Sequence, residues 1–402
     1  MNATWICCQL GQREGYLAPR ALREHGQAAH LVTEAWMPPG FSTATLGSLL
    51  PGLRSRYHPD WAGVPVRHAT MRYLAFEALQ RLQGREGWDL TLRRNDWFKD
   101  FSAHALDGLR RELGPAQPVT LLSYSYTALS AFRLAKRLGW TCILCQMDCG
   151  IEHERIGRDL AAQYPSFSEP HVAPPARYWE EWREECALAD RIVVNSAWAS
   201  KCLAAAGVAE AKLRVIPLPE LSSPAGTHAK RSYPPQFDAA RPLRVLFVGQ
   251  VGLTKGIAAL LEASALLEKE PVEIHIVGPL RVQVPERFLR ALNLRWIGRV
   301  AHDRVREYFR NADVFLFPSM CDGFGIVQSE AVAEGLPVIA SRFCGDVVAD
   351  GVNGIRLDEV SGPSIAAVLR ELSMNSDRLK KMSASAASRR WNVRDYGHAL
   401  LA

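Results

Sequence analysis

The sequence predicts an α/β protein built from two doubly wound domains, each a parallel sheet flanked by helices. Short apolar runs alternate with stretches of helical periodicity along the chain, which is typical of repeated βαβ units. A chain of 402 residues suits two domains of about 200 residues better than one core. The alternation is interrupted near residues 219–242, a polar stretch rich in Ser, Pro and Gly. We therefore expect two Rossmann-like domains facing each other across a cleft, with ligands at the carboxyl ends of the strands.

The boundaries follow from the same pattern. In the first half, we expect strands over residues 5–10, 28–32, 119–122, 140–146 and 191–194, and a helix over 127–138 that Gly139 ends. In the second half, the expected strands cover residues 244–248, 272–277, 294–297, 314–317 and 337–340, with helices over 256–267, 326–334 and 364–372. This divides the chain into an N-terminal domain (1–222), a linker (223–242), a C-terminal domain (243–387) and a last helix at about 388–402.

Composition and charge narrow the class of protein. The net charge of +6 is spread along the chain without a basic arm, so the sequence predicts no nucleic-acid partner, while a mild attraction to phosphorylated ligands or an anionic membrane face fits. We find no apolar run of the roughly 18 residues that cross a bilayer and no signal-peptide pattern at the N-terminus. Peripheral membrane contact is compatible with this pattern. We expect a cytoplasmic protein, with the inner face of the membrane as an alternative location.

The nine cysteines are scattered and lie mostly in apolar stretches, which indicates free thiols in a reducing cytosol. Cys142 and Cys145 have the spacing of a metal or redox pair. No second pair with zinc-like spacing accompanies them, and the surrounding residues resemble a buried strand. We interpret these thiols as structural.

The strongest chemical signal is a strand, a glycine-containing loop and a helix over residues 314–334. Gly323 and Gly325 allow the loop backbone to approach a ligand closely, and the first helical amides, at Ile326 and Val327, lack partners within the helix. Amide donors and the helix dipole together favour an anion at such a terminus. The segment therefore predicts a phosphate site.

Two carboxylates accompany this site. Glu330 lies one turn into the helix on the face of Ile326, where it could accept the hydroxyls of a ribose. Asp322 precedes the loop, where it could hold sugar hydroxyls beside the phosphates. The alternatives are that Asp322 merely caps the helix and that Glu330 is an exposed helical acid.

This segment resembles the donor-site signature of retaining glycosyltransferase family 4: an acid, seven residues, then Glu, with Gly-Phe-Gly after the first acid. Here Asp322 stands where the family usually has Glu, and Phe324 is the central residue of Gly-Phe-Gly. Residues 245–256 resemble the family's first donor strand, with Gly249 and Lys255 in place, while Gln250 replaces the Arg that helps to clamp the diphosphate. For Lys255 alone, a solvated lysine after a strand is the alternative. The resemblance covers most of residues 244–374 and implies the GT-B fold.

The resemblance also assigns further contacts. The turn at Arg299 and Val300 would lie against the nucleotide base, with an ordinary strand exit as the alternative. The loop from Gly11 to Gly15 resembles the family's first loop, which approaches the diphosphate from across the cleft, with a simple tight turn as the alternative. The last helix would cross back to the first domain.

The implied reaction is the transfer of a sugar from a nucleotide diphosphate to a polysaccharide or glycolipid precursor, with retention of configuration. Asp322 and Lys255 would act on the sugar and the diphosphate. Relatives often carry a His near the reacting sugar where this chain has residues 145–150, and Asp148 is the titratable residue there, although a turn-forming Asp before Gly150 is the alternative. The neighbouring residues Glu152, His153 and Glu154 are interpreted as a solvated helix start, with a metal site as the less favoured alternative.

The chain contains no D-x-D sequence, so we expect transfer without a metal or any other cofactor, with the nucleotide sugar as the donor substrate. Two other classes are open: a nucleotide-sugar 2-epimerase of the same fold, and a nucleotide-sugar binding protein with impaired catalysis. The replacements at Gln250 and Asp322 motivate the second.

Overall fold

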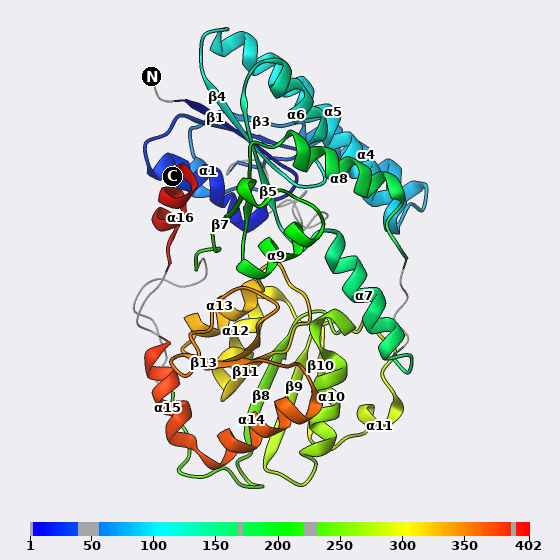
Figure 1. Cartoon of the computed structure of the whole chain (residues 1–402), viewed down its shortest axis with the longest axis vertical. Helices are drawn as coiled ribbons and strands as arrows, with labels where there is room; N and C mark the ends of the chain where they lie inside the picture. The colour runs from blue at the N-terminus through cyan, green and yellow to red at the C-terminus, as the bar shows by residue number, and fades with distance from the viewer. Residues whose placement is uncertain (1–2, 39–55, 168–171, 221–230, 387–390) are drawn as a thin grey trace.

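The computed structural model describes residues 3–38, 56–167, 172–220, 231–386 and 391–402, with the side chains of residues 302 and 303 left aside. Two α/β domains follow each other along the long axis of the molecule (Figure 1). The N-terminal sheet has the strand order β3-β2-β1-β4-β5-β6-β7, and the C-terminal sheet has the order β10-β9-β8-β11-β12-β13. All strand pairs within these sheets are parallel, which confirms the expected fold class.

The N-terminal sheet contains the five expected strands and two short edge strands. All residues of β1 and β4 are buried, as the apolar runs indicate for strands covered on both faces. The sequence did not reveal β3 and β7, because two or three residues carry too little pattern to register as a strand. The seven strands are β1 (Thr4–Gln9), β2 (Ala29–Thr33), β3 (Val66–Arg67), β4 (Val119–Tyr124), β5 (Thr141–Gln146), β6 (Arg191–Val194) and β7 (Leu213–Val215).

The C-terminal sheet likewise contains the five expected strands and adds β13 at its edge. Its strands are β8 (Leu243–Val248), β9 (Val272–Val277), β10 (Leu294–Gly298), β11 (Val314–Phe317), β12 (Val338–Ser341) and β13 (Gly354–Leu357). Tyr233 and Phe237, within the expected linker 223–242, are buried in the core of this domain. Residues 221–230 lie outside the described part of the chain.

Helices cover both faces of each sheet. In the N-terminal domain these are α1 (Leu17–Glu24), α4 (Thr70–Leu82), α5 (Gly87–Leu113), α6 (Leu129–Arg137), α7 (Ile151–Gln163), α8 (Ala176–Leu188) and α9 (Ala197–Ala205). The C-terminal half adds α10 (Ile257–Leu266), α11 (Glu286–Leu289), α12 (His302–Asn311), α13 (Ile326–Ala333), α14 (Gly362–Met374), α15 (Ser376–Ser385) and α16 (Val393–Leu401). Among the described helices, none combines the length and apolar character needed to cross a membrane.

The C-terminal helix α16 leaves the C-terminal domain and lies beside α1 of the N-terminal domain (Figure 1). Tyr396 and Leu400 are buried there in the same cluster as Leu17. The ring of His25 is 2.7 Å from the carbonyl oxygen of Arg394. Residues from near both ends of the chain therefore pack together in the N-terminal domain.

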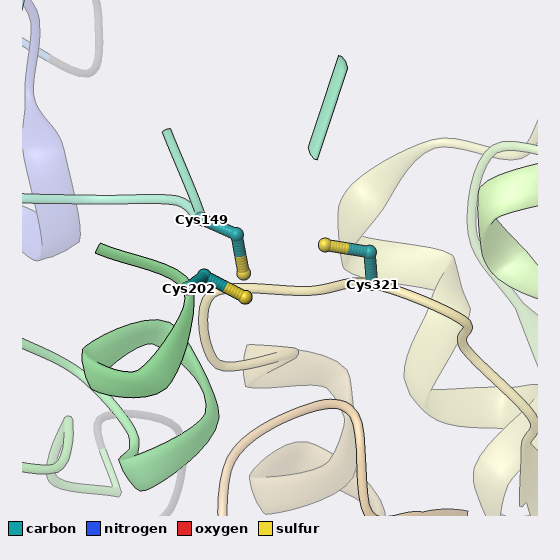
Figure 2. Close-up of side chains that lie close together, drawn as sticks. All are labelled: Cys149, Cys202 and Cys321. Carbon is teal, nitrogen blue, oxygen red and sulfur yellow. The ribbon is translucent and has the colours of Figure 1, made fainter. Parts of the chain in front are cut away.

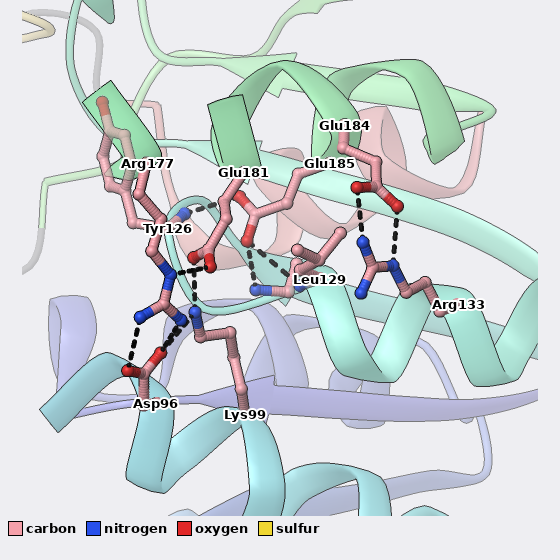
Figure 3. A network of polar contacts seen from close by, with 10 residues as sticks. Asp96, Lys99, Tyr126, Leu129, Arg133, Arg177, Glu181, Glu184 and Glu185 are labelled. Atoms are coloured by element: carbon pink, nitrogen blue, oxygen red, sulfur yellow. Dashed lines mark hydrogen bonds and ion pairs between the residues drawn. The ribbon is translucent and has the colours of Figure 1, made fainter. Parts of the chain in front are cut away.

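A polar network joins α5, α6 and α8 in the N-terminal domain (Figure 3). The buried carboxylate of Glu185 accepts backbone hydrogen bonds from Tyr126 (2.7 Å), Ala128 (2.7 Å) and Leu129 (3.0 Å) at the start of α6. Burial raises the pKa of Glu185 to about 8, although these N–H groups favour the charged form. Next to it, the buried ammonium of Lys99 pairs with Glu181 and Asp96. This network fixes the turn that follows β4.

Candidate active site

The carboxyl edge of the C-terminal sheet has its topological switch point between β8 and β11, because the chain proceeds from β8 to β9 on one side and from β11 to β12 on the other. Ligands of doubly wound proteins bind at such a point. The loops that follow these two strands touch each other here. Gly256 has a φ of +75°, and a Cβ at this position would lie 1.9 Å from the carbonyl oxygen of Pro318. Only glycine allows the loops to approach this closely.

Lys255 and Asp322 meet at this switch point. The Lys255 ammonium forms an ion pair with the Asp322 carboxylate, and the two side chains are 26% and 18% exposed. The other Asp322 oxygen accepts a hydrogen bond from the Phe324 amide (3.3 Å). The N-cap of α13 is Gly325, which provides no side-chain cap. Asp322 therefore does not cap the helix, and the capping alternative is wrong.

The start of α13 is accessible. Gly325 adopts a left-handed conformation with a φ of +77°, and the Gln328 side chain donates to the carbonyl of Phe324 (2.9 Å), which holds the loop in place. Ile326 is 36% exposed, and Val327 and Glu330 are partly exposed. The first helical amides thus lie in a fixed loop close to the surface, an arrangement suited to an anion.

The loop before α13 also forms a contact between the two domains. The Ser196 hydroxyl donates to the carbonyl of Gly323 (2.6 Å), and a Cβ at Gly323 would lie 2.2 Å from the carbonyl oxygen of Met147. Phe324 is 5% exposed within a core cluster of the N-terminal domain. Gly323 and Phe324 are therefore covered by the N-terminal domain in this arrangement.

Asp148 lies opposite this loop. One of its oxygens accepts hydrogen bonds from the Tyr126 hydroxyl (2.6 Å), the Gln146 side chain (2.6 Å) and the Gly150 amide (2.9 Å). The contact with Gly150 is the turn that the sequence suggested as the alternative. Burial, and next the charge of Asp148, raise the pKa of Tyr126 well above its ordinary value. Asp148 is thus placed at the domain interface, in a rigid polar network.

His153 is the residue that sequence reasoning misjudged. It lies on the first turn of α7 and is only partly exposed, so the interpretation as part of a solvated helix start is wrong for this side chain. A hydrogen bond with Cys321 raises the pKa of His153, against the opposite effect of burial, and the charges of Asp148 and Lys255 also act on it. The sequence feature that could have pointed to His153 is its position five residues after Asp148.

The glycine loop of the N-terminal domain follows β1, at the switch point of its sheet between β1 and β4. Gly11 and Gly15 both have positive φ values, +88° and +62°, as a tight turn requires. The Gly11 amide donates to the buried carboxylate of Glu34 (2.9 Å), which in turn pairs with Arg56. This amide is thus engaged within the protein, which favours the simple turn at Gly11.

The other expected donor contacts lie along the same sheet edge. Gly249 and the exposed Gln250 follow β8, and a Cβ at Gly278 would lie 1.7 Å from the Gly249 carbonyl oxygen, so the exits of β8 and β9 are in contact. Arg299 is exposed after β10, two strands from β8. Val300 packs against the core. The structure thus joins Lys255 directly to Asp322 and places Arg299 farther along the edge.

Comparison with solved structures identifies the arrangement of the two domains as the GT-B fold. HepE of Anabaena in complex with UDP aligns over 100% of this chain and 98% of its own, with a TM-score of 0.57 at 13% identity. Sucrose-phosphate synthase of Thermosynechococcus elongatus aligns over 99% and 95%, with a TM-score of 0.56 at 17% identity.

Residues 233–389 match the family described as glycosyl transferases group 1. A D-inositol 3-phosphate glycosyltransferase of Xylanimonas cellulosilytica is 34% identical over 172 residues, which are 39% of this chain and 40% of that protein. The amylovoran biosynthesis glycosyltransferase AmsK of Erwinia amylovora is 28% identical over 149 residues, 33% and 36% of the two chains. The chain thus matches less than half the length of these relatives. The family match lies within the C-terminal half of the chain, from Tyr233 to residue 389.

Proposed function

We propose that this protein is a retaining glycosyltransferase of family 4 that transfers a sugar from a nucleotide diphosphate sugar to a carbohydrate or lipid-linked acceptor. The observation that carries this proposal is the pairing of Lys255 with Asp322 beside the accessible start of α13. The Lys255 cation and the helix N-terminus suit the diphosphate leaving group, and the Asp322 carboxylate suits the hydroxyls of the sugar. The group 1 family match over residues 233–389 supports the same class.

The leaving diphosphate would be stabilised by the amides of Ile326 and Val327, by Lys255 and by hydrogen bonds from Gln250. In the closed arrangement Lys255 is neutralised by Asp322. A partly exposed pair of this kind contributes only about 1 kcal/mol or less. Donor binding would therefore easily redirect Lys255 to the phosphates and free Asp322 for the sugar hydroxyls.

Retention follows if the acceptor attacks the face that the diphosphate leaves, with a diphosphate oxygen taking the acceptor proton. We propose that this step uses no metal, because Lys255 and the helix start supply the positive potential that a cation would otherwise provide. Separation and closure of the domains about Gly323 would admit the donor and then exclude water.

The acceptor belongs by this proposal to surface polysaccharide or glycolipid assembly, on the cytoplasmic side. Erwinia AmsK is named for amylovoran biosynthesis, which is consistent with such a role. The HepE structures contain UDP or UDP-glucose, so UDP is the first nucleotide to test.

Thermal unfolding with UDP, GDP and ADP tests the proposal, since a ligand selective for the native state raises the melting temperature. We expect one nucleoside diphosphate to stabilise the wild type and to lose most of this effect in Lys255→Ala. The matching nucleotide sugar should then release its nucleotide with an acceptor present, in EDTA as well as in buffer. Conversion of the donor to an epimer without acceptor would identify the epimerase alternative instead. Binding without release for every acceptor would identify the impaired protein.

A further inference from the structure

Three cysteines from different parts of the chain converge where the domains meet (Figure 2). Cys149 lies two residues before α7, Cys202 lies on α9, and Cys321 lies in the loop between β11 and α13. Their sulfur atoms all lie within 4.8 Å of one another. All three side chains are buried, and Cys321, from the C-terminal domain, belongs to a core cluster of the N-terminal domain.

The other six cysteines are also buried, but they form no such cluster among the described residues. All nine cysteines are free and buried. Among the described residues, only Cys149, Cys202 and Cys321 form a group of three or more with metal-ligand geometry. Cys142, for comparison, is buried in β5, where its thiol donates to the carbonyl of Trp140 and its amide donates to the carboxylate of Asp190.

The distances suit a soft metal ion. Zinc–sulfur bonds of about 2.3 Å place the sulfurs of a tetrahedral site about 3.8 Å apart. The three sulfurs lie within 4.8 Å, so shifts of about 1 Å or less in the side chains would complete the geometry. His153 lies on the first turn of α7, four residues after Cys149, and its ring nitrogens are not among the atoms that lie within 4.8 Å of one another, so the ring would have to move toward the cluster to act as a fourth ligand. Three cysteines and one histidine form one of the regular structural zinc sites.

We propose that Cys149, Cys202 and Cys321 bind a zinc ion between the two domains, with His153 as the fourth ligand. Binding converts the three thiols to thiolates and releases three protons to solvent. Two thiolates and the imidazole come from the N-terminal domain, and the third thiolate comes from the residue directly before Asp322. The ion therefore ties the donor loop to the opposite domain and stabilises the closed arrangement.

This proposal departs from the expectation that the chain holds no metal. Its test does not depend on the proposed transfer reaction, because the ion would be held by thiolates and not by the diphosphate. The bound ion would, however, restrict the separation of the domains about Gly323 that the proposed function uses to admit the donor. The site forms only when the domains are closed, since Cys321 reaches the other two cysteines across the interface.

The first test measures the zinc content of the full chain, purified without chelator or metal-affinity resin. We expect about one zinc per chain in the wild type, background levels in Cys149→Ser, Cys202→Ser and Cys321→Ser, and wild-type content in the buried control Cys142→Ser. Circular dichroism verifies the folding of each variant. Wild-type zinc content in the three cluster variants would overturn the proposal.

Cobalt substitution keeps the proposal testable even if a variant fails to fold. Cobalt(II) added to the zinc-free wild type should produce thiolate-to-cobalt charge-transfer absorption and tetrahedral visible bands. In His153→Gln the affinity should fall about tenfold or more, as for loss of one ligand, while the thiolate bands persist. Chelation should expand the particle in small-angle X-ray scattering.

A wild-type protein with background zinc and no cobalt charge-transfer bands would refute the site. A mass lower by two hydrogens, mapped to a pair of these cysteines, would show a disulfide in place of the metal and would refute it as well.

Discussion

Replacing Gly323 by alanine tests whether the contact between the domains is part of the active arrangement. The new Cβ would lie 2.2 Å from the Met147 carbonyl oxygen, whereas carbon–oxygen contacts in proteins begin near 3.3 Å. The loop and residue 147 must therefore separate by about 1 Å. The backbone at Gly323 is not left-handed, so alanine itself causes no strain there.

This displacement has two calculable consequences. The hydrogen bond from Ser196 to the Gly323 carbonyl, now 2.6 Å, would lengthen to about 3.6 Å and be lost, a change of about 1 kcal/mol. A shift of about 1 Å in groups that position a substrate lowers catalysis by up to about 100-fold. We expect kcat/KM for sugar transfer to fall by 10- to 100-fold in Gly323→Ala. Ser196→Ala, which removes this hydrogen bond together with the N-cap bond from the Ala199 amide (3.0 Å) but adds no clash, should lower kcat/KM about fivefold.

Initial rates of donor consumption with acceptor present, together with melting temperatures, measure this effect. Gly108→Ala is the matched control, because a Cβ at this position in α5 meets no atom within 4 Å. Its activity should be unchanged and its helix slightly stabilised. Unchanged kcat/KM in Gly323→Ala would refute the role of the closed contact in catalysis.

Three further predictions follow from the same structure. In Lys255→Ala, kcat should fall about 100-fold, as for loss of one preorganised donor, with a stability change of about 1 kcal/mol or less; equal kcat values would remove Lys255 from the mechanism. Gly256→Ala should destabilise the protein by more than about 2 kcal/mol, because its Cβ would lie 1.9 Å from the Pro318 carbonyl oxygen. Gly298→Ala, with the same φ of +75° and open space around the Cβ, should cost only about 1 kcal/mol. Equal losses of unfolding free energy for the two variants in urea would contradict the close contact between the loops. Burial raises the pKa of Glu185 in the folded protein to about 8, above its ordinary value of 4.5, so the folded state binds more protons between these two values. The free energy of unfolding should therefore fall as pH rises from 5 to 8, by at most about 5 kcal/mol. Glu185→Gln should lack this component, and parallel stability curves of variant and wild type would refute the assignment.

The sequence predicted the central strands of both sheets because their long apolar runs report burial on both faces. It could not predict β3 or β7, whose two and three residues are recognised only through their partners, and it also missed β13, which is as long as β6, β11 and β12. The helices α4 and α5 also went unpredicted, in a region where the sequence analysis identified no element.

At the candidate site, the sequence located Lys255, Asp322 and the start of α13, because strand, loop and helix are consecutive there. The environments of Asp148 and His153 depend on packing between domains, and no local pattern encodes it. The cluster of Cys149, Cys202 and Cys321 was hidden for the same reason, since its members are far apart in the chain.

A crystal structure with the nucleoside diphosphate that most stabilises the protein tests the central claim most directly. We predict the diphosphate oxygens within about 3.2 Å of the amides of Ile326 and Val327 and of the Lys255 ammonium. The Asp322 carboxylate should then be released from Lys255. A nucleotide bound away from the start of α13, with the pair of Lys255 and Asp322 intact, would contradict the account.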